Sequence, residues 1–372
     1  MWGCSMDIYI FNRNIELQGI IDNFTSLIWT RKYGKSGEFS LTTNVTDNVI
    51  NLLKRDNIIY KKDDTEGAFI ETVEISLNSQ GKEEIKVTGK FLTSYLNRRI
   101  NWTKLVKRGT YESIMRLLVS NNAINTIANR IINNLELGEF KGYTGTTKYT
   151  NSYGNVLELL ENISNSSDLG FRLNLNITTK KMQFEVYEGV DRTINQSLIA
   201  PCIFSRDFEN VLEQKYFDSI NNYKNTSLIC GVGEDEARVK TNLGDNNIGL
   251  DRYELYVDAK DLSNKETIDN VEVEISADEY IAMLQQRGSE KLGETKKVQT
   301  FSGKVNTNGN NVYKKDYDLG DIVTVLDKKW GLTIDTRITE IEEVYEVGGL
   351  QINPTFGNNI PTIIDKIKQV VK

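Results

Sequence analysis

Histidine is absent from this sequence of 372 residues. Imidazole is the usual general acid or base near neutral pH, the usual partner of serine and cysteine nucleophiles, and a frequent ligand of catalytic zinc. The absence argues against these classes of enzyme. We therefore expect no catalytic residue, no cofactor and no metal.

Cysteine and proline are scarce, with three residues of each. Cys4, Cys202 and Cys230 are far apart and show no CxxC spacing, so we expect reduced thiols in a chain made in a cytoplasm. Three prolines without any Ser/Gly-rich tract predict no flexible linker. The domains should therefore be tightly interleaved.

Long apolar runs and blocks of one charge are missing too. No run approaches the roughly 18 apolar residues of a membrane span, and no signal peptide begins the chain, so we expect no membrane contact. Residues 1–5 resemble a leader before a natural start at Met6. The net charge is -7, and no stripe of basic residues is present, which argues against a protein dedicated to nucleic-acid recognition. An acidic surface would, however, let DNA pass along it without binding.

The hydrophobic pattern predicts an α+β, β-rich fold. Short alternating runs at residues 7–11, 57–60, 69–77 and 83–89 indicate a small β-barrel or sandwich within the first 99 residues. From about residue 100 the period changes to that of helices. Thr110 can cap one helix, and a second helix from Val156 should be closed by Gly170.

The second half of the chain returns to strands. We expect strands at residues 227–230, 250–257 and 300–305, with one helix opened by a capping box from Ser276 to Glu279. Residues 318–321 read as a turn, followed by a strand at 322–326, a turn at 328–331 and a long alternation over 332–347. This is a curled antiparallel meander without catalytic residues.

The last segment, residues 358–372, has the pattern of an amphipathic helix with Pro361 in its first turn. It is either an ordinary core helix or a contact site for a partner or a second copy. The apolar stripe that forms this candidate assembly interface consists of Ile363, Ile364, Ile367, Val370 and Val371.

Three groups of residues invite a more specific function. Asp316, Asp318 and Asp321 are spaced closely enough to suggest calcium, but a turn at the entry to a strand explains them better. Acids at residues 234–236 and 342–343, Glu234 among them, could serve a glycosidase, yet such clusters are usually solvated. Gly231-x-Gly233 follows a strand but lacks the third glycine of a nucleotide-binding loop.

Several motifs follow one another in a recognisable order. They are residues 34–41, Tyr-Glu-Gly-Val-Asp-Arg-Thr at 187–193, Gly-Val-Gly at 231–233, Tyr-Asp-Leu-Gly-Asp-Ile-Val at 317–323, and Arg337-Ile338. In this order the sequence resembles the hub proteins at the tip of bacteriophage tails. The likeness is greatest to prophage and siphophage tail proteins related to the baseplate hub of contractile phages, and it covers Met6 to about Gly357.

The resemblance implies two small, similar β-barrel domains interleaved with an α+β domain, in a protein that forms a homotrimer. Mapped onto this chain, the first barrel is residues 6–99 and the second is 196–249 with 298–357. The α+β domain is 100–195 with 250–297, and residues 358–372 form the C-terminal helix.

The function implied is that of a structural hub of a baseplate or tail tip, in a phage or a phage-tail-like particle. A trimeric ring would adapt the hexameric tail tube to a threefold tip around a central channel. Expected partners are the tail tube or distal tail protein, a tip spike or fibre protein and the tape-measure protein, with DNA only as channel cargo. The location is the virion tail, after synthesis in the bacterial host cytoplasm.

Two alternatives remain open at this point: a carboxylate-dependent cell-wall hydrolase and a receptor- or carbohydrate-binding tail component. Many relatives carry a peptidase or lysozyme domain after this region, whereas the sequence ends at Lys372. We therefore expect wall degradation to belong to another protein.

Overall fold

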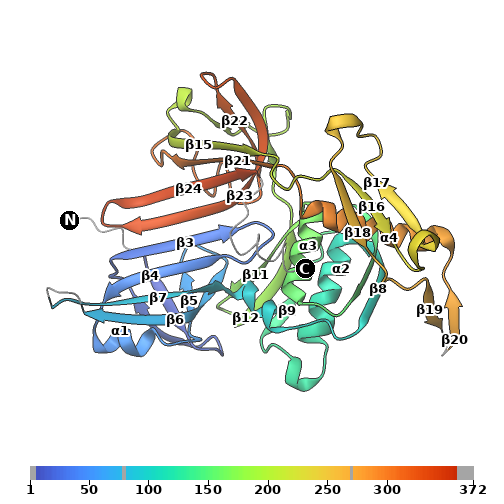
Figure 1. The fold of residues 1–372 in the computed structure, drawn as a ribbon. Helices are drawn as coiled ribbons and strands as arrows, with labels where there is room; N and C mark the ends of the chain where they lie inside the picture. The colour runs from blue at the N-terminus through green and yellow to red at the C-terminus, as the bar shows by residue number, and fades with distance from the viewer. Residues whose placement is uncertain (1–5, 78–80, 269–270, 358–372) are drawn as a thin grey trace.

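The computed structural model describes residues 6–77, 81–268 and 271–357 (Figure 1). It is a mixed α+β chain dominated by strands, as the hydrophobic pattern predicted. The predicted C-terminal helix with Ile363, Ile364, Ile367, Val370 and Val371 lies outside the described residues. Within the described ranges, no helix combines the length and the apolar character needed to cross a membrane.

One large sheet of 14 strands joins the two ends of the chain. In order along the sheet, its strands are β15 (Val211–Ser219), β21 (Val298–Val305), β24 (Gly349–Gly357), β23 (Leu332–Glu346), β3 (Ser26–Lys32), β4 (Glu38–Asn44), β7 (Glu83–Phe91), β6 (Gly67–Leu77), β5 (Ile58–Lys61), β1 (Ile8–Phe11) and β2 (Leu17–Ile21). Off this path, β22 (Ile322–Asp327) pairs with β23 and also with β13 (Asp191–Arg192) and β14 (Ile203–Phe204).

The pairing of β3 with β23 is the seam between the N-terminal and C-terminal halves of this sheet. The register runs antiparallel from Ser26 opposite Glu346 to Lys32 opposite Glu340. In Figure 1 the blue and red strands lie side by side at this seam. Residues more than 300 positions apart in the sequence therefore share one backbone hydrogen-bond ladder.

The N-terminal half has a core built from alternating side chains. Leu27 and Trp29 of β3 and Phe39 and Leu41 of β4 all point to the same side and are almost fully buried. A short helix, α1 (Asp47–Leu52), which the sequence pattern did not predict, covers part of this core. Its N-cap Thr46 accepts a hydrogen bond from the Val49 amide.

The C-terminal half is the predicted meander. β22 and the first part of β23 form a hairpin, and the second part of β23 pairs with β24 on one edge and β3 on the other. Its core contains Phe204, Phe301, Phe356, Val323 and Ile338. The predicted turn at residues 328–331 is confirmed, because the Gly331 amide donates to the Lys328 carbonyl.

Neither half is a closed barrel in the described strand pairing. The path of the sheet ends at β15 and at β2, which each have one neighbour on it. β3 uses one edge to pair with β4 and the other to pair with β23, in the opposite half. In place of two separate closed barrels, the described strands form two halves of one sheet, each with its own core.

The α+β part lies beside the N-terminal half (Figure 1). Its core lies between two helices and two small sheets and includes Leu118, Leu160, Phe171 and Phe184. The elements are β8 (Lys104–Thr110), α2 (Tyr111–Val119), β9 (Leu135–Leu137), β10 (Thr146–Ser152), α3 (Val156–Ser167), β11 (Gly170–Asn176) and β12 (Lys181–Tyr187). The short helical turns of the chain are η1 (Leu92–Arg98), η2 (Ser120–Ile124), η3 (Ala128–Arg130), η4 (Arg206–Phe208), η5 (Asp235–Ala237) and η6 (Gly249–Asp251).

Both helix starts in this region agree with the sequence, but one helix end differs. The Thr110 side chain caps α2 by accepting from the Ser113 amide. α3 ends at Ser167 with Asp168 as its C-cap in the left-handed conformation, so the prediction that Gly170 closes this helix was wrong. Gly170 instead opens β11, where the ring of Tyr33 leaves no room for a side chain.

A separate small unit is built from β16 (Thr226–Cys230), β17 (Lys240–Leu243), β18 (Glu254–Asp258) and α4 (Ala277–Gly293). Its core joins Ile229, Val257 and Leu284. The resemblance places residues 196–249 in the second barrel, but within this range β16 pairs with β17 and β18 and packs against α4. Strands β19 (Lys265–Ile268) and β20 (Val271–Glu274) form a ribbon of their own.

Candidate functional site

The loop that follows β3 places Tyr33 where three parts of the chain meet. Its hydroxyl donates to the Asp168 carbonyl at 2.7 Å, at the end of α3. Its ring contacts Tyr187 of β12 edge-on at 5.2 Å, and the guanidinium of Arg337 from β23 lies 4.9 Å from the ring centre. Burial raises the pKa of Tyr33 to about 12, so this hydroxyl remains a donor.

Glycines leave the space that Tyr33 occupies. A Cβ at Gly170 would lie 2.5 Å from the Tyr33 ring, and a Cβ at Gly320 would lie 2.6 Å from it. Gly320 also has a φ of +94°, a conformation that side chains disfavour. Gly189 packs against the Gly320 carbonyl so closely that a Cβ there would overlap it. The contact between the loops therefore requires glycine on both sides.

Asp321 fixes the turn before β22. Its carboxylate accepts from the Val190 amide at 2.8 Å, from Arg192 Nε at 2.8 Å and from the Asp318 amide at 3.0 Å. The Asp321 amide donates to the Asp318 carbonyl, which confirms the predicted turn. One carboxylate thus ties residues 187–193 to the start of the C-terminal meander.

The three aspartates proposed for calcium have separate partners. Asp316 accepts from the Val312 amide at 2.8 Å, and Asp318 accepts from Arg31 Nη1 at 2.7 Å. Within the described residues, no group of three acidic, cysteine or histidine side chains could hold a metal ion. Asp316, Asp318 and Asp321 act as turn and ion-pair residues here.

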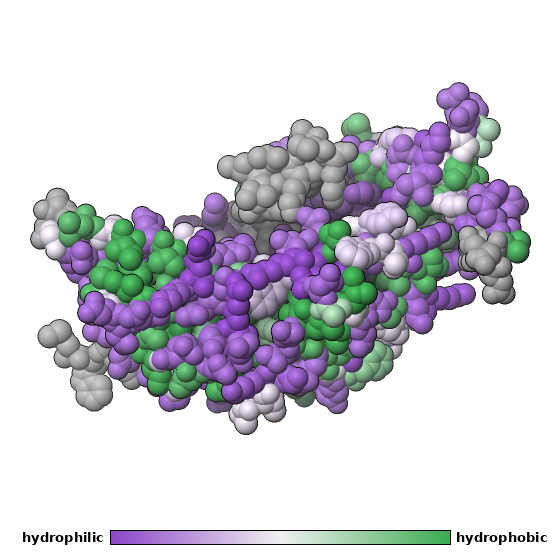
Figure 2. Space-filling model, turned by 90° about the horizontal axis from the view of Figure 1, so that it is seen from below, coloured by the Kyte–Doolittle hydropathy of each residue, from purple (hydrophilic) through white to green (hydrophobic). Residues whose placement is uncertain are grey.

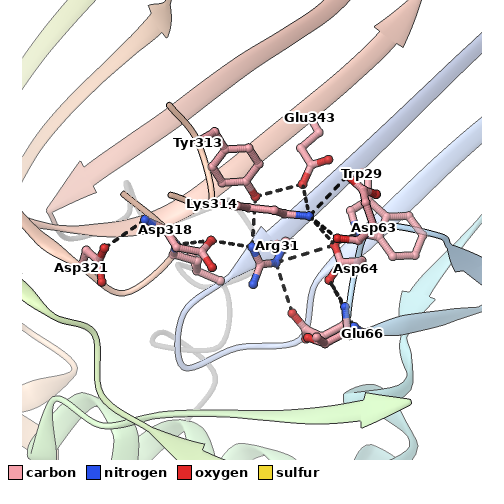
Figure 3. Close-up of polar contacts among 12 residues, drawn as sticks. Trp29, Arg31, Asp63, Asp64, Glu66, Tyr313, Lys314, Asp318, Asp321 and Glu343 are labelled. Carbon is pink, nitrogen blue, oxygen red and sulfur yellow. Dashed lines mark hydrogen bonds and ion pairs between the residues drawn. The ribbon is translucent and has the colours of Figure 1, made fainter. Parts of the chain in front are cut away.

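Close to Tyr33 in the sequence, Arg31 belongs to a group of charges, most of them buried, which we name the joint cluster (Figure 3). Arg31 lies at its centre, with a side chain only 3% exposed. Its guanidinium contacts Asp318 at 2.7 Å and Glu66 at 3.4 Å. The members of the joint cluster are Arg31, Lys61, Asp64, Glu66, Lys314, Asp318 and Glu343.

Lys61 makes a second link across the seam. Its ammonium group is fully buried and lies 2.8 Å from Glu343 of β23. The Tyr345 hydroxyl donates to the same carboxylate at 2.6 Å. Because Lys61 ends β5 and Glu343 lies on β23, this pair joins the N-terminal half to the C-terminal half independently of the β3–β23 ladder.

Two carboxylates of the N-terminal half beside Arg31, those of Asp64 and Glu66, differ in their pKa. Burial alone would raise the pKa of Asp64, but Arg31, Lys314 and Lys61 together hold it well below its ordinary value. Trp29 Nε1 also donates to Asp64 at 3.0 Å. Burial raises the pKa of Glu66 to about 7 in spite of Arg31, and the nearby charge of Asp64 adds to the rise.

The joint cluster connects the N-terminal half of the sheet to the C-terminal half. Its side chains come from β3, β5, the loop after β5, the turn before β22, and β23, and they pair with one another (Figure 3). A buried network of this kind loses much stability when one member is removed, because a charge is left without a partner. It therefore specifies one relative position of the two halves.

The motifs that carry the resemblance converge on this joint. Residues 187–193, residues 317–323 and Arg337 lie next to Tyr33 or Asp321, and residues 34–41 lead directly from Tyr33 into β4. The remaining motif lies elsewhere, because a Cβ on Gly231 would be 2.3 Å from the hydroxyl of Tyr280 in α4. Gly231-x-Gly233 thus serves helix packing.

The acids considered for a hydrolase are not brought together as a pair. Glu342 and Glu343 are neighbours on β23 and point to opposite faces, Glu342 toward Asn353 and Glu343 toward Lys61. Glu234 immediately precedes the exposed turn η5, where Glu236 pairs with Lys240.

Sequence reasoning missed Arg31, Tyr33, Lys61, Asp64 and Glu66. A signal was present for two of them. Arg31 continues the inward alternation of Leu27 and Trp29, and Lys61 follows Ile59 on the same face of β5. A charged residue in the inward register of a strand indicates a buried ion pair, because it is costly otherwise.

Comparison with known proteins agrees with this arrangement. The family described as Siphovirus ReqiPepy6 Gp37-like protein matches residues 7–358. No curated protein matches the chain.

Solved structures with a similar fold come from prophages and bacteria. The prophage MuSo2 43 kDa tail protein from Shewanella oneidensis is 14% identical, with a TM-score of 0.59, over 94% of this chain and 98% of that one. A tail protein from Neisseria meningitidis MC58 is 14% identical, with a TM-score of 0.58, over 96% and 97%. Prophage tail protein gp18 from Listeria monocytogenes EGD-e is 12% identical, with a TM-score of 0.56, over 98% of both chains.

Proposed function

Because the chain belongs to the Siphovirus ReqiPepy6 Gp37-like family of phage tail proteins, we propose that it is a structural hub of a phage tail tip or baseplate. Three copies form a ring that adapts the hexameric tail tube to a threefold tip and lines a central channel. Its location is the virion tail.

The observation that carries this proposal is the seam. Two curled half-sheets with separate cores are held in one fixed relation by the β3–β23 ladder and by the joint cluster. A chain with two units at a fixed spacing supplies six units when three copies assemble. That number matches a hexameric tube, and a rigid seam keeps the six positions regular.

The finer assignments belong to the same proposal. The two half-sheets act as two barrel-like domains, and the stripe at residues 363–371 is a contact for a partner or a second copy. The partners are the tail tube or distal tail protein, a tip spike or fibre protein, and the tape-measure protein. DNA passes only as cargo of the channel.

Light scattering of the purified chain during gel filtration tests the trimer. We expect a particle of three chain masses, with a ring in negative-stain images. A monomer at every concentration, together with no ring in isolated tails, would contradict the proposal.

A further inference from the structure

The β19–β20 ribbon stands apart from the rest of the fold. Among the described strands, these two pair only with each other. Figure 1 shows the ribbon projecting at the end of the molecule that also carries β8 and β18. A ribbon of two strands is at best marginally stable in water, so it gains from pairing with a further strand.

The outer strand of this ribbon is acidic. Val271 and Val273 alternate with Glu272 and Glu274, and all four side chains are exposed. Glu272 lies 3.6 Å from Lys265 across the ribbon, whereas Glu274 makes no ion pair within the described part of the chain. Figure 2 shows that hydrophilic and hydrophobic groups are mixed over this face of the molecule.

A basic edge strand lies at the same end of the molecule. β8 pairs only with β10 among the described strands, so one edge of its backbone is open. Its residues Lys104, Lys107 and Arg108 are exposed and form no ion pair within the described ranges. By contrast, Lys148 on β10 is paired within the chain, 2.5 Å from Glu279 of α4.

The backbone of both edges is available. No hydrogen bond to another described segment engages the backbone amides or carbonyls of residues 104–109, or those of residues 271–274, beyond their own ribbons. An open strand edge can pair with another strand unless something covers it. Opposite charges on the two strands favour such pairing. β8 and β20 also present valines of similar exposure, Val106 at 42% and Val273 at 41%.

We propose that β20 of one copy pairs edge to edge with β8 of a neighbouring copy, so that two ribbons become one four-stranded sheet between chains. With Val273 opposite Val106, Glu272 and Glu274 lie on the same face of the shared sheet as Lys107. We assign the strand that pairs with β8 to a second copy of this chain, because β20 has the opposite charge to β8 and a valine of similar exposure. The inference rests on the proposed function only in taking the neighbour to be another copy.

Cysteine cross-linking tests the pairing. The variant carries Val106→Cys and Val273→Cys in a background with Cys4→Ser, while the native Cys202 and Cys230 are buried. On mild oxidation we expect disulfide-linked dimers and trimers on a non-reducing gel. The control variant carries Val106→Cys and Leu77→Cys. Leu77 is exposed on the β6–β7 hairpin, away from the proposed contact, so this variant should run as single chains on the same gel.

Charge reversal provides a second readout on the full chain. Glu272→Lys with Glu274→Lys should weaken self-association by about tenfold or more, and adding Lys107→Glu, on the same face of the shared sheet, should restore much of it. A three-copy particle without cross-links or rescue would overturn this inference and leave the proposed hub intact. Cross-linked pairs without a three-copy particle would support the inference and contradict the hub. A disulfide formed within single chains would also overturn the inference. A gel shift of duplex DNA by the wild type that is lost in Lys107→Glu would indicate that β8 binds DNA and does not pair with β20.

Discussion

At the level of single residues, Arg31 holds more parts of the chain together than its position in a strand suggests. It reaches Asp318 of the C-terminal half and Glu66 of the N-terminal half while almost fully buried. Burial opposes its charge, but Tyr313, Asp64, Asp318 and Glu66 raise the pKa of Arg31 above its ordinary value. The guanidinium is therefore a permanent charge in the seam.

Replacement of this residue, Arg31→Met, should lower the free energy of unfolding by about 3–5 kcal/mol, because buried carboxylates lose their partner. Arg31→Lys keeps the charge but loses the planar fork, so its loss should be smaller. Urea denaturation measures both. Wild-type stability of Arg31→Met would show that the joint cluster does not hold the halves.

Glu66 should give the protein a pH-dependent stability. Its pKa is raised from 4.5 to about 7, so between these values the folded state holds a proton that the unfolded chain has released. Its contribution to stability is fully present below the lower value and is lost as the pH rises through the upper one.

The variant Glu66→Gln cannot titrate and should avoid this loss. Between pH 5 and pH 8 the wild type should lose about 2 kcal/mol relative to the variant. Thermal or urea unfolding across this range measures the difference. Parallel profiles for the two proteins would show that Glu66 keeps an ordinary pKa.

Residue roles were only partly predictable. The turn role of Asp318 and Asp321 follows from their spacing before a β-branched strand, and the structure confirms that turn. The partner of Asp318 did not follow, because Arg31 lies 287 residues away and no local pattern encodes that contact. Tyr33 gave no signal, since its role depends on glycines in two other loops.

At the level of elements, strands with clean alternation were predicted well. β11 and β12, the β22–β23 hairpin and the caps of α2 and α4 are set by nearby residues, and the structure has them within a few positions. α1 was missed because its six residues show too little periodicity. The resemblance placed β16 and β17 in the second barrel, whereas they pair with each other and with β18. The sequence pattern could not correct this, because alternation does not identify the partner strand.

The turn before β22 offers a direct test of this account. Gly320→Ala should destabilise by about 2–4 kcal/mol, because its φ is positive and its Cβ would meet the Tyr33 ring. The matched control is Gly331→Ala, which has a φ of +66° but open space around it. The control should cost only about 1 kcal/mol. Equal losses in chemical denaturation would mean that the loop contact adds nothing.

At the level of the whole molecule, the sheet is the feature that the hydrophobic pattern could not predict. Alternation located most of its strands but not the pairing of β3 with β23, which joins residues at opposite ends of the chain. The resemblance supplied the division into two β-rich parts. The structure adds that the two parts share one ladder and one buried group of charges.

This arrangement gives the buried charges at the seam a structural role. Each half has a core of its own, so hydrophobic burial alone would leave their relative position poorly specified. The joint cluster and the glycine contacts around Tyr33 fix that position. A fixed position is what a ring of repeated units requires.

The most direct test of the central claim is electron cryomicroscopy of the assembled tail that contains this chain. We predict three copies per tail at the tip, arranged as a ring around an open channel, with six β-rich units facing the tube. A tail in which the chain is absent from the tip, or is present there in one copy or in six, would contradict the account.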